Sequence, residues 1–316
     1  MKHNIKITTI LIVMFLVTQF IGLFVVANYN SENGMDFPYG INPDEDIKET
    51  TVTKGLFSVL LIFVVAIILF FLLMTLNAKT IIRFWYFGVT ILAIALTINV
   101  FFFKLNFITY SSILALITAV PLAYFKIIKR NLLIHNLTEL IIYPGIAAVF
   151  ISFLGSLFGS KIVLGTIIIL FLISLYDIWA VWQSGFMQKM AKFQIDQLQF
   201  FTGFFVPYAN KKEKNKIKFI KDKYSGKSDK FLEKQFKKAR IKVNLAILGG
   251  GDVVFPIITS GVFYKLFGLI PAMIIIAFST LALLTLFIMA RKGRFYPAMP
   301  FITSGIYLGM LVGWII

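Results

Sequence analysis

The chain has 316 residues, of which 59% are hydrophobic and only 14% are charged, and its formal net charge is +17. With a mean hydropathy of +0.88, it has too few charged side chains to cover the surface of a soluble globular protein, so the composition predicts a membrane protein. The sequence has no cysteine and two histidines, which excludes disulfides and thiolate chemistry and argues against a metal site. We therefore expect neither a metal ion nor another cofactor.

Apolar stretches of about 20 residues recur along the chain, which is the length that a helix needs to cross about 30 Å of hydrocarbon. They predict spans near residues 6–27, 55–76, 83–103, 105–125, 139–159, 162–183, 243–264, 266–289 and 296–316. The first stretch follows two lysines, as a signal peptide does, but it is longer than a typical signal core and predicts an uncleaved span. The expected fold class is all-α, a polytopic membrane protein with about nine transmembrane helices.

Lysine and arginine collect in alternate connections between the predicted spans, and sixteen of them lie in residues 184–242. Under the positive-inside rule this distribution places the N-terminus and the 184–242 loop in the cytoplasm and the C-terminus outside. The chain then divides into a six-span part (1–183), a basic cytoplasmic loop (184–242) and a three-span part (243–316). The basic residues flank membrane spans, so we expect them to face lipid headgroups and expect no nucleic-acid partner. The apolar stretch 200–208 is too short to span and is expected to fold back against the bundle.

Two acidic residues lie well inside predicted spans, Asp177 in the sixth and Asp252 in the seventh. A carboxylate at the centre of a membrane helix costs on the order of 2.5–3.5 kcal/mol on insertion scales, so both residues need a reason to be there. The two spans are antiparallel, and the rise of a helix places both residues at similar depth. Two carboxyl groups that meet in a low-dielectric site share a proton, which lets them activate water and protonate a peptide carbonyl. Their joint occurrence on adjacent spans therefore favours peptide hydrolysis inside the membrane, while an ion or proton pathway stays open.

The backbone before Asp252 is unusual for a membrane helix. Gly249, Gly250 and Gly251 in a helix interior each cost up to about 1 kcal/mol relative to alanine, and Pro256 removes the helical hydrogen bond to the carbonyl of Asp252. This stretch predicts a thin or unwound backbone that pairs with an opened substrate strand. Close helix packing through small residues is the alternative explanation of the glycines.

Three short motifs lie in or beside the sixth, seventh and last predicted spans: Tyr176-Asp177, Gly249-Gly250-Gly251-Asp252 and Pro297-Ala298-Met299. Together they resemble the GxGD intramembrane proteases of the presenilin and signal peptide peptidase family, except that methionine replaces the last residue of the family's Pro-Ala-Leu motif. The resemblance implies an intramembrane aspartyl protease in which Asp177 and Asp252 are catalytic and the other motif residues shape the substrate site. It also implies transmembrane or signal-peptide substrates, and the charge distribution favours the presenilin-like orientation.

Two other functions are left open by the residues alone. A prepilin-peptidase-like aspartyl protease also uses a GxGD motif, but it cuts at the cytoplasmic boundary. A proton- or cation-coupled channel or transporter also uses paired membrane carboxylates, although the helix breaks show no inverted repeat. Presenilin itself works with partner subunits, whereas this compact chain indicates no obligate partner subunit and leaves self-association open.

Overall fold

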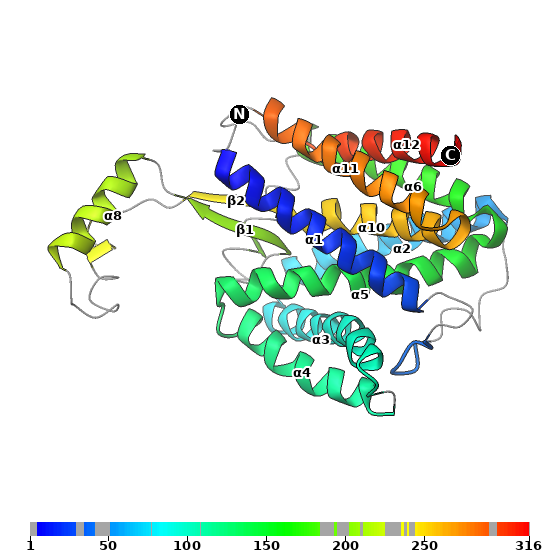
Figure 1. Ribbon diagram of the computed structural model, residues 1–316, viewed down its shortest axis with the longest axis horizontal. Coiled ribbons are helices and arrows are strands. Elements are labelled where there is room, and N and C mark those ends of the chain that lie inside the picture. Colours follow the sequence, from blue (N-terminus) through cyan, green and yellow to red (C-terminus); the bar gives the residue numbers. More distant parts are fainter. Residues whose placement is uncertain are drawn as a thin grey trace.

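The computed structural model of the protein describes residues 5–29, 35–41, 51–76, 78–107, 109–183, 193–194, 202–208, 211–224, 235–236, 239, 244–290 and 296–315. Nine apolar helices in these ranges form one bundle (Figure 1): α1 (Ile5–Tyr29), α2 (Val52–Thr75), α3 (Lys79–Lys104), α4 (Ser111–Ile127), α5 (Leu132–Phe158), α6 (Ile162–Ile178), α10 (Gly250–Phe267), α11 (Leu269–Met289) and α12 (Met299–Ile315). The expected class, a polytopic helical membrane protein with about nine spans, is confirmed.

Five helical stretches of the described chain are long and apolar enough to cross a membrane. One of them, Leu132–Gln183, reverses direction at the short 3-10 turn η1 (Gly159–Lys161) and so contains both α5 and α6. Gly159 ends α5 with a φ of 50°, a conformation that glycine adopts without a steric penalty. Many large apolar side chains remain exposed, and the central window of α2 has no buried residue. Such an apolar exterior is suited to lipid rather than to water.

The centre of the bundle is formed where α1, α5 and α10 pack together, with α6 and α12 beside α10. α11 and α12 also pack closely, because α12 presents small residues to its neighbour. A Cβ atom added at Gly309 of α12 would lie 2.9 Å from the Cα of Ile275 in α11, so a side chain there would collide with main chain. Small residues that let two backbones approach are typical of helix contacts in membranes.

One two-stranded antiparallel sheet occurs among the described residues, made of β1 (Gly203–Tyr208) and β2 (Asn244–Gly249). Its register pairs Gly203 with Gly249 and Tyr208 with Asn244. The sequence predicts a helix over all of 243–264, and this is wrong for its first residues, because α10 begins only at Gly250. A short apolar run has no periodicity that separates strand from helix, so the pairing with β1 decides its structure. The expectation that 200–208 folds back is confirmed for 203–208, since β1 contacts α5 and α1.

The helix α8 (Lys211–Lys223) extends away from the bundle beyond the sheet (Figure 1). Most of the basic loop predicted over 184–242 lies outside the described residues. The N-terminal end of α1 lies at the end of the bundle that carries the sheet, and the C-terminal end of α12 lies at the opposite end (Figure 1).

Candidate active site

Asp177 lies in the last turn of α6 and is buried, with 4% of its surface exposed. Its Oδ2 accepts a hydrogen bond of 3.0 Å from the backbone N–H of Met299, and the backbone N–H of Ala298 also donates to this carboxyl group. Met299 is the first residue of α12, so the carboxylate lies at the positive end of that helix's dipole. The amino end of α12 therefore provides the polar partners of a carboxylate buried in an apolar bundle.

Two further hydrogen bonds hold α6 beside α12. The hydroxyl of Ser174 donates to Oγ1 of Thr303 at 2.8 Å in a buried position, and the hydroxyl of Tyr307 donates to the carbonyl of Ile167 at 2.6 Å. Both bonds join α6 to α12 and lie N-terminal to Asp177 along α6. They fix the sliding position of one helix along the other, and so keep the Asp177 carboxylate at the start of α12.

Asp252 lies in the first turn of α10, three residues after β2 ends. The backbone N–H of Gly249 donates a hydrogen bond to its carboxyl group. Gly249 is the N-cap of α10 in an extended conformation, with φ −65° and ψ 147°. The glycines therefore lie at the start of the helix, not in its interior as the sequence predicts, and the expected non-helical backbone lies in 244–249. Because this backbone leaves the helix at Gly249, its N–H is available to the carboxylate.

The three glycines of the GxGD motif have different surroundings. A Cβ on Gly249 would lie 3.1 Å from Oδ2 of Asp252, and a Cβ on Gly250 would lie 2.8 Å from the ring of Tyr143. A Cβ on Gly251 would meet nothing closer than Phe255, at 4.0 Å. Space is therefore limited at the first two positions and free at the third.

The structure brings several of the predicted site residues together. α6, α10 and α12 contact one another, and the carboxyl groups of Asp177 and Asp252 are within electrostatic range. Pro297 is buried and Ala298 half-buried at the entry to α12. The ring of Tyr176 makes an edge contact with Phe63 of α2, with centroids 5.3 Å apart, and Tyr176 is also within electrostatic range of Asp177. Tyr176 therefore packs between α6 and α2 beside the pair, and its part in shaping the substrate site stays a prediction.

Tyr143 of α5 is a site neighbour that the sequence does not single out. It is 3% exposed, lies against Gly250, and makes an edge contact with Phe204 of β1 at a centroid distance of 5.8 Å. A tyrosine in an apolar span is usually a packing residue, so no sequence signal separates it from the others. Among the described residues, no group of three or more histidines, cysteines or acidic residues is arranged to hold a metal ion.

Two acidic residues lie on neighbouring helices of a polytopic bundle, within electrostatic range of each other, and each accepts a hydrogen bond from the main chain. The family model described as "Signal-peptide peptidase, presenilin aspartyl protease" matches residues 9–316, and the chain belongs to this family. It is an intramembrane aspartic endopeptidase that acts on transmembrane segments or signal peptides, and an integral multi-pass membrane protein. The family assignment gives no support to the channel or transporter alternative.

The fold resembles two solved structures. The structure of a presenilin family intramembrane aspartate protease in space group C222 has 17% sequence identity and a TM-score of 0.60, and the alignment covers 98% of this chain and 98% of that chain. A structure of a presenilin family intramembrane aspartate protease in space group P2 has 18% identity and a TM-score of 0.57, with 96% of each chain covered. At such low identity the likeness concerns the fold. No curated protein matches the chain in sequence.

Proposed function

We propose that Asp177 and Asp252 are the catalytic pair of this protease and that the substrate is cut while it is paired with the outer edge of β2. The observation that carries the proposal is the placement of Asp252 directly after β2 and within electrostatic range of Asp177. A strand that leads into one aspartate offers main-chain partners to a peptide at the point where the carboxyl pair acts.

The pair acts in one protonation state with one acidic proton. The ionised aspartate takes a proton from a water molecule, and the oxygen of that water attacks the scissile carbonyl carbon. The protonated aspartate gives its proton to the carbonyl oxygen. The resulting gem-diol collapses when the newly protonated aspartate gives its proton to the leaving nitrogen and the C–N bond breaks. The other aspartate takes a hydroxyl proton from the gem-diol, which leaves a carboxylic acid and an amine and restores the one-proton pair. Two N–H donors and the α12 dipole stabilise negative charge on Asp177, which favours Asp177 as the ionised member and Asp252 as the acid.

The register of the sheet determines which backbone groups of β2 are available. Pro207 has no N–H, so Pro207 and Leu245 form a pair without hydrogen bonds between them, and the backbone groups of Leu245 point away from β1. Such pairs alternate with hydrogen-bonded pairs along an antiparallel ladder, so the backbone groups of Ile247 also point away from β1. A transmembrane segment must lose its own helical hydrogen bonds before a peptide bond is accessible. Pairing with the outward groups of β2 replaces part of what the unwound segment loses.

The proposal is tested with a membrane-embedded reporter substrate and the variants Asp177→Asn and Asp252→Asn. We expect both to abolish cleavage while the proteins accumulate and unfold like the parent, because the amide keeps the shape of the carboxyl group and removes its proton chemistry. The matched control is Asp222→Asn on α8, an exposed acidic residue that should be silent. Full activity in either active-site variant rejects the assignment. A cut inside the reporter's membrane span, rather than at its boundary, separates this enzyme from a prepilin-peptidase-like one.

The orientation inferred from the charges belongs to the same proposal: the N-terminus and the 184–242 loop in the cytoplasm and the C-terminus outside. It is supported by the placement of the sheet end and the α12 end at opposite ends of the bundle (Figure 1). The absence of cysteine makes the natural chain a background for single-cysteine labelling. With an impermeant maleimide on intact cells, Ile315→Cys should label at once and Lys218→Cys only after permeabilisation. The reverse pattern contradicts the orientation.

We further propose that the chain works without an obligate partner subunit, its six-span part (1–183) and three-span part (243–316) each supplying one aspartate. The purified single chain in liposomes should then cleave the reporter. Activity that appears only after other membrane proteins are added contradicts this part of the proposal.

A further inference from the structure

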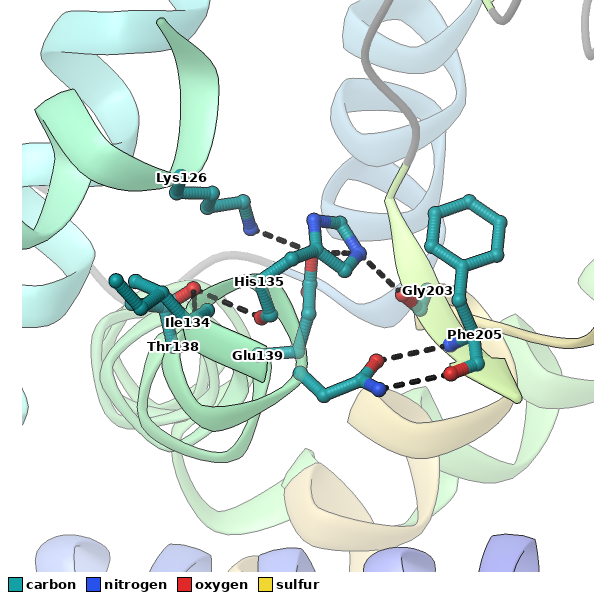
Figure 2. A network of polar contacts seen from close by, with 8 residues as sticks. Lys126, Ile134, His135, Thr138, Glu139, Gly203 and Phe205 are labelled. Atoms are coloured by element: carbon teal, nitrogen blue, oxygen red, sulfur yellow. Dashed lines mark hydrogen bonds and ion pairs between the residues drawn. The ribbon is translucent and has the colours of Figure 1, made fainter. Parts of the chain in front are cut away.

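A buried polar network joins α4, α5 and β1 (Figure 2). The Nζ atom of Lys126 lies 2.5 Å from Oε1 of Glu139, and these residues are 4% and 0% exposed. The Nε2 atom of His135 lies 3.6 Å from the same oxygen and 2.9 Å from the carbonyl oxygen of Gly203 in β1. The carbonyl only accepts hydrogen bonds, so Nε2 carries the proton. Charged groups removed from solvent inside a membrane bundle are costly, and the aspartate mechanism uses none of these three side chains.

The network continues to a second residue of β1 through Asn136. Its Nδ2–H donates to the carbonyl of Phe205 at 2.7 Å, and its Oδ1 accepts from the N–H of Phe205 at 2.9 Å. This paired donor and acceptor contact is the one that a neighbouring strand would make with Phe205. The side chain of Asn136 therefore occupies the place of a third strand on β1.

These contacts fall on one edge of β1, the edge that faces away from β2. Gly203, Phe205 and Pro207 alternate along the strand, and their backbone groups point outward because Pro207 cannot take part in the ladder. His135 binds the first residue, Asn136 binds the second, and the third has no N–H to offer. Proline and covering side chains are known ways of blocking the edge of a sheet.

The outer edge of β2 is different. No third strand pairs with β2 within the described chain, and the outward backbone groups of this edge belong to Leu245, Ile247 and Gly249. The N–H of Gly249 is used by Asp252, and the side chain of Ile247 is 38% exposed. Among the residues that the structure describes, the sheet thus has one closed edge and one open edge, and the open edge leads to Asp252.

We propose that His135 and Asn136 are positioning residues that close β1, so that a substrate strand pairs only with β2 and in a fixed position relative to Asp252. Strands in a sheet lie about 4.8 Å apart, so a peptide on the far edge of β1 would be two strand spacings, roughly 10 Å, from β2 and beyond hydrogen-bond reach of the carboxyl pair. The Lys126–Glu139 pair orients the ring of His135. The expected effect on cleavage rests on the proposed function, whereas the closing of the β1 edge can be measured in an inactive protein.

The test compares two Asn→Ala variants on the same helix. Asn136→Ala removes both bonds to Phe205, whereas Asn131→Ala removes two N-cap bonds, from the N–H groups of Leu133 and Ile134, and leaves β1 untouched. A substrate strand on the opened edge of β1 lies out of reach of the carboxyl pair, so it binds without being cut. Asn136→Ala should therefore lower kcat and KM by the same factor, roughly tenfold, and leave kcat/KM and the cleavage site unchanged. Asn131→Ala should unfold at lower temperature but keep the parental kcat and KM.

Amide hydrogen exchange at Phe205 provides a readout that is independent of activity. Asn136 accepts a hydrogen bond from the N–H of Phe205, so exchange at Phe205 should accelerate in Asn136→Ala and not in Asn131→Ala. The same difference should be seen when each variant also carries Asp177→Asn, which removes cleavage. If the parent does not cleave, the proposed function fails while the exchange result still decides whether Asn136 closes the edge. Parental values of both kcat and KM, or unchanged exchange at Phe205, in Asn136→Ala overturn the inference.

A second variant opens the same edge with little risk to folding. Pro207 is exposed, and Pro207→Ala restores an outward N–H to β1 without removing any side-chain hydrogen bond. We expect the same joint fall of kcat and KM, to a smaller extent, with an unchanged unfolding temperature. Parental kcat and KM in both Pro207→Ala and Asn136→Ala contradict the role of the closed edge.

Discussion

The backbone N–H of Met299 donates a hydrogen bond to Oδ2 of Asp177, across 122 positions of sequence. The Pro-Ala-Met motif therefore acts on the aspartate through its main chain, at the point where α12 begins. This explains why methionine is compatible with a position where the family has leucine, because every residue except proline supplies the same N–H.

Changing Met299 to proline tests this main-chain contact. Proline is favoured at the first residue of a helix, so Met299→Pro should keep α12 while deleting the N–H donor to Asp177. A hydrogen bond to a charged group contributes about 1.5–3 kcal/mol, so kcat/KM should fall roughly ten- to a hundredfold. The control Met299→Leu keeps both the N–H and the side-chain volume and should retain the parental rate. A parental kcat/KM in Met299→Pro would show that the contact is dispensable.

The glycines before Asp252 should respond differently to alanine. Gly250→Ala forces a methyl group against Tyr143 and should lower the free energy of unfolding by about 1–3 kcal/mol, as overpacking does. Gly251→Ala meets open space and should leave stability equal or slightly higher. Thermal unfolding of the purified variants measures both. The added change Tyr143→Leu should recover part of the loss in Gly250→Ala, and equal losses in the two alanine variants would contradict the packing.

The buried pair Lys126–Glu139 should show strong coupling. Removing one partner leaves an uncompensated charge among apolar side chains, so Lys126→Met or Glu139→Gln alone should cost about 3–5 kcal/mol of stability. The double variant leaves no charge unpaired and should be more stable than either single one. Denaturant unfolding of all four proteins gives the coupling energy. Additive losses would mean that the two side chains act independently.

Close packing of α11 against α12 should matter for activity as well as stability. Gly309→Ala puts a Cβ 2.9 Å from the Cα of Ile275, so the two helices must separate and the start of α12 moves relative to Asp177. We expect a lower unfolding temperature together with a lower kcat. The matched control is Gly88→Ala on α3, which meets nothing within 4 Å and should be silent in both measurements. A stable and fully active Gly309→Ala would contradict the close approach.

The helices were largely predictable, and the regions where the prediction fails have identifiable causes. The fifth span is predicted to begin near residue 139, with Glu139 at its edge and His135 in the short basic loop before it. α5 in fact begins at Leu132, since Lys126 from the neighbouring helix neutralises Glu139 inside the bundle. A hydropathy pattern describes one segment at a time and has no information about a partner on another helix. The same limitation conceals the strand 244–249, which forms by pairing with 203–208.

The sequence by itself determined that this protein lies in a lipid bilayer, that it consists of a series of apolar helices, and that two adjacent spans each carry one acidic residue. These features follow from residue type, because the free energy of moving a carboxylate or an apolar side chain into lipid depends mainly on the side chain itself. Only the tertiary structure decided which groups bind the two carboxylates and which edge of the sheet is open. The N–H groups of Met299 and Gly249 belong to the main chain, which is alike at almost every position, so no residue pattern marks them before the helices are packed together.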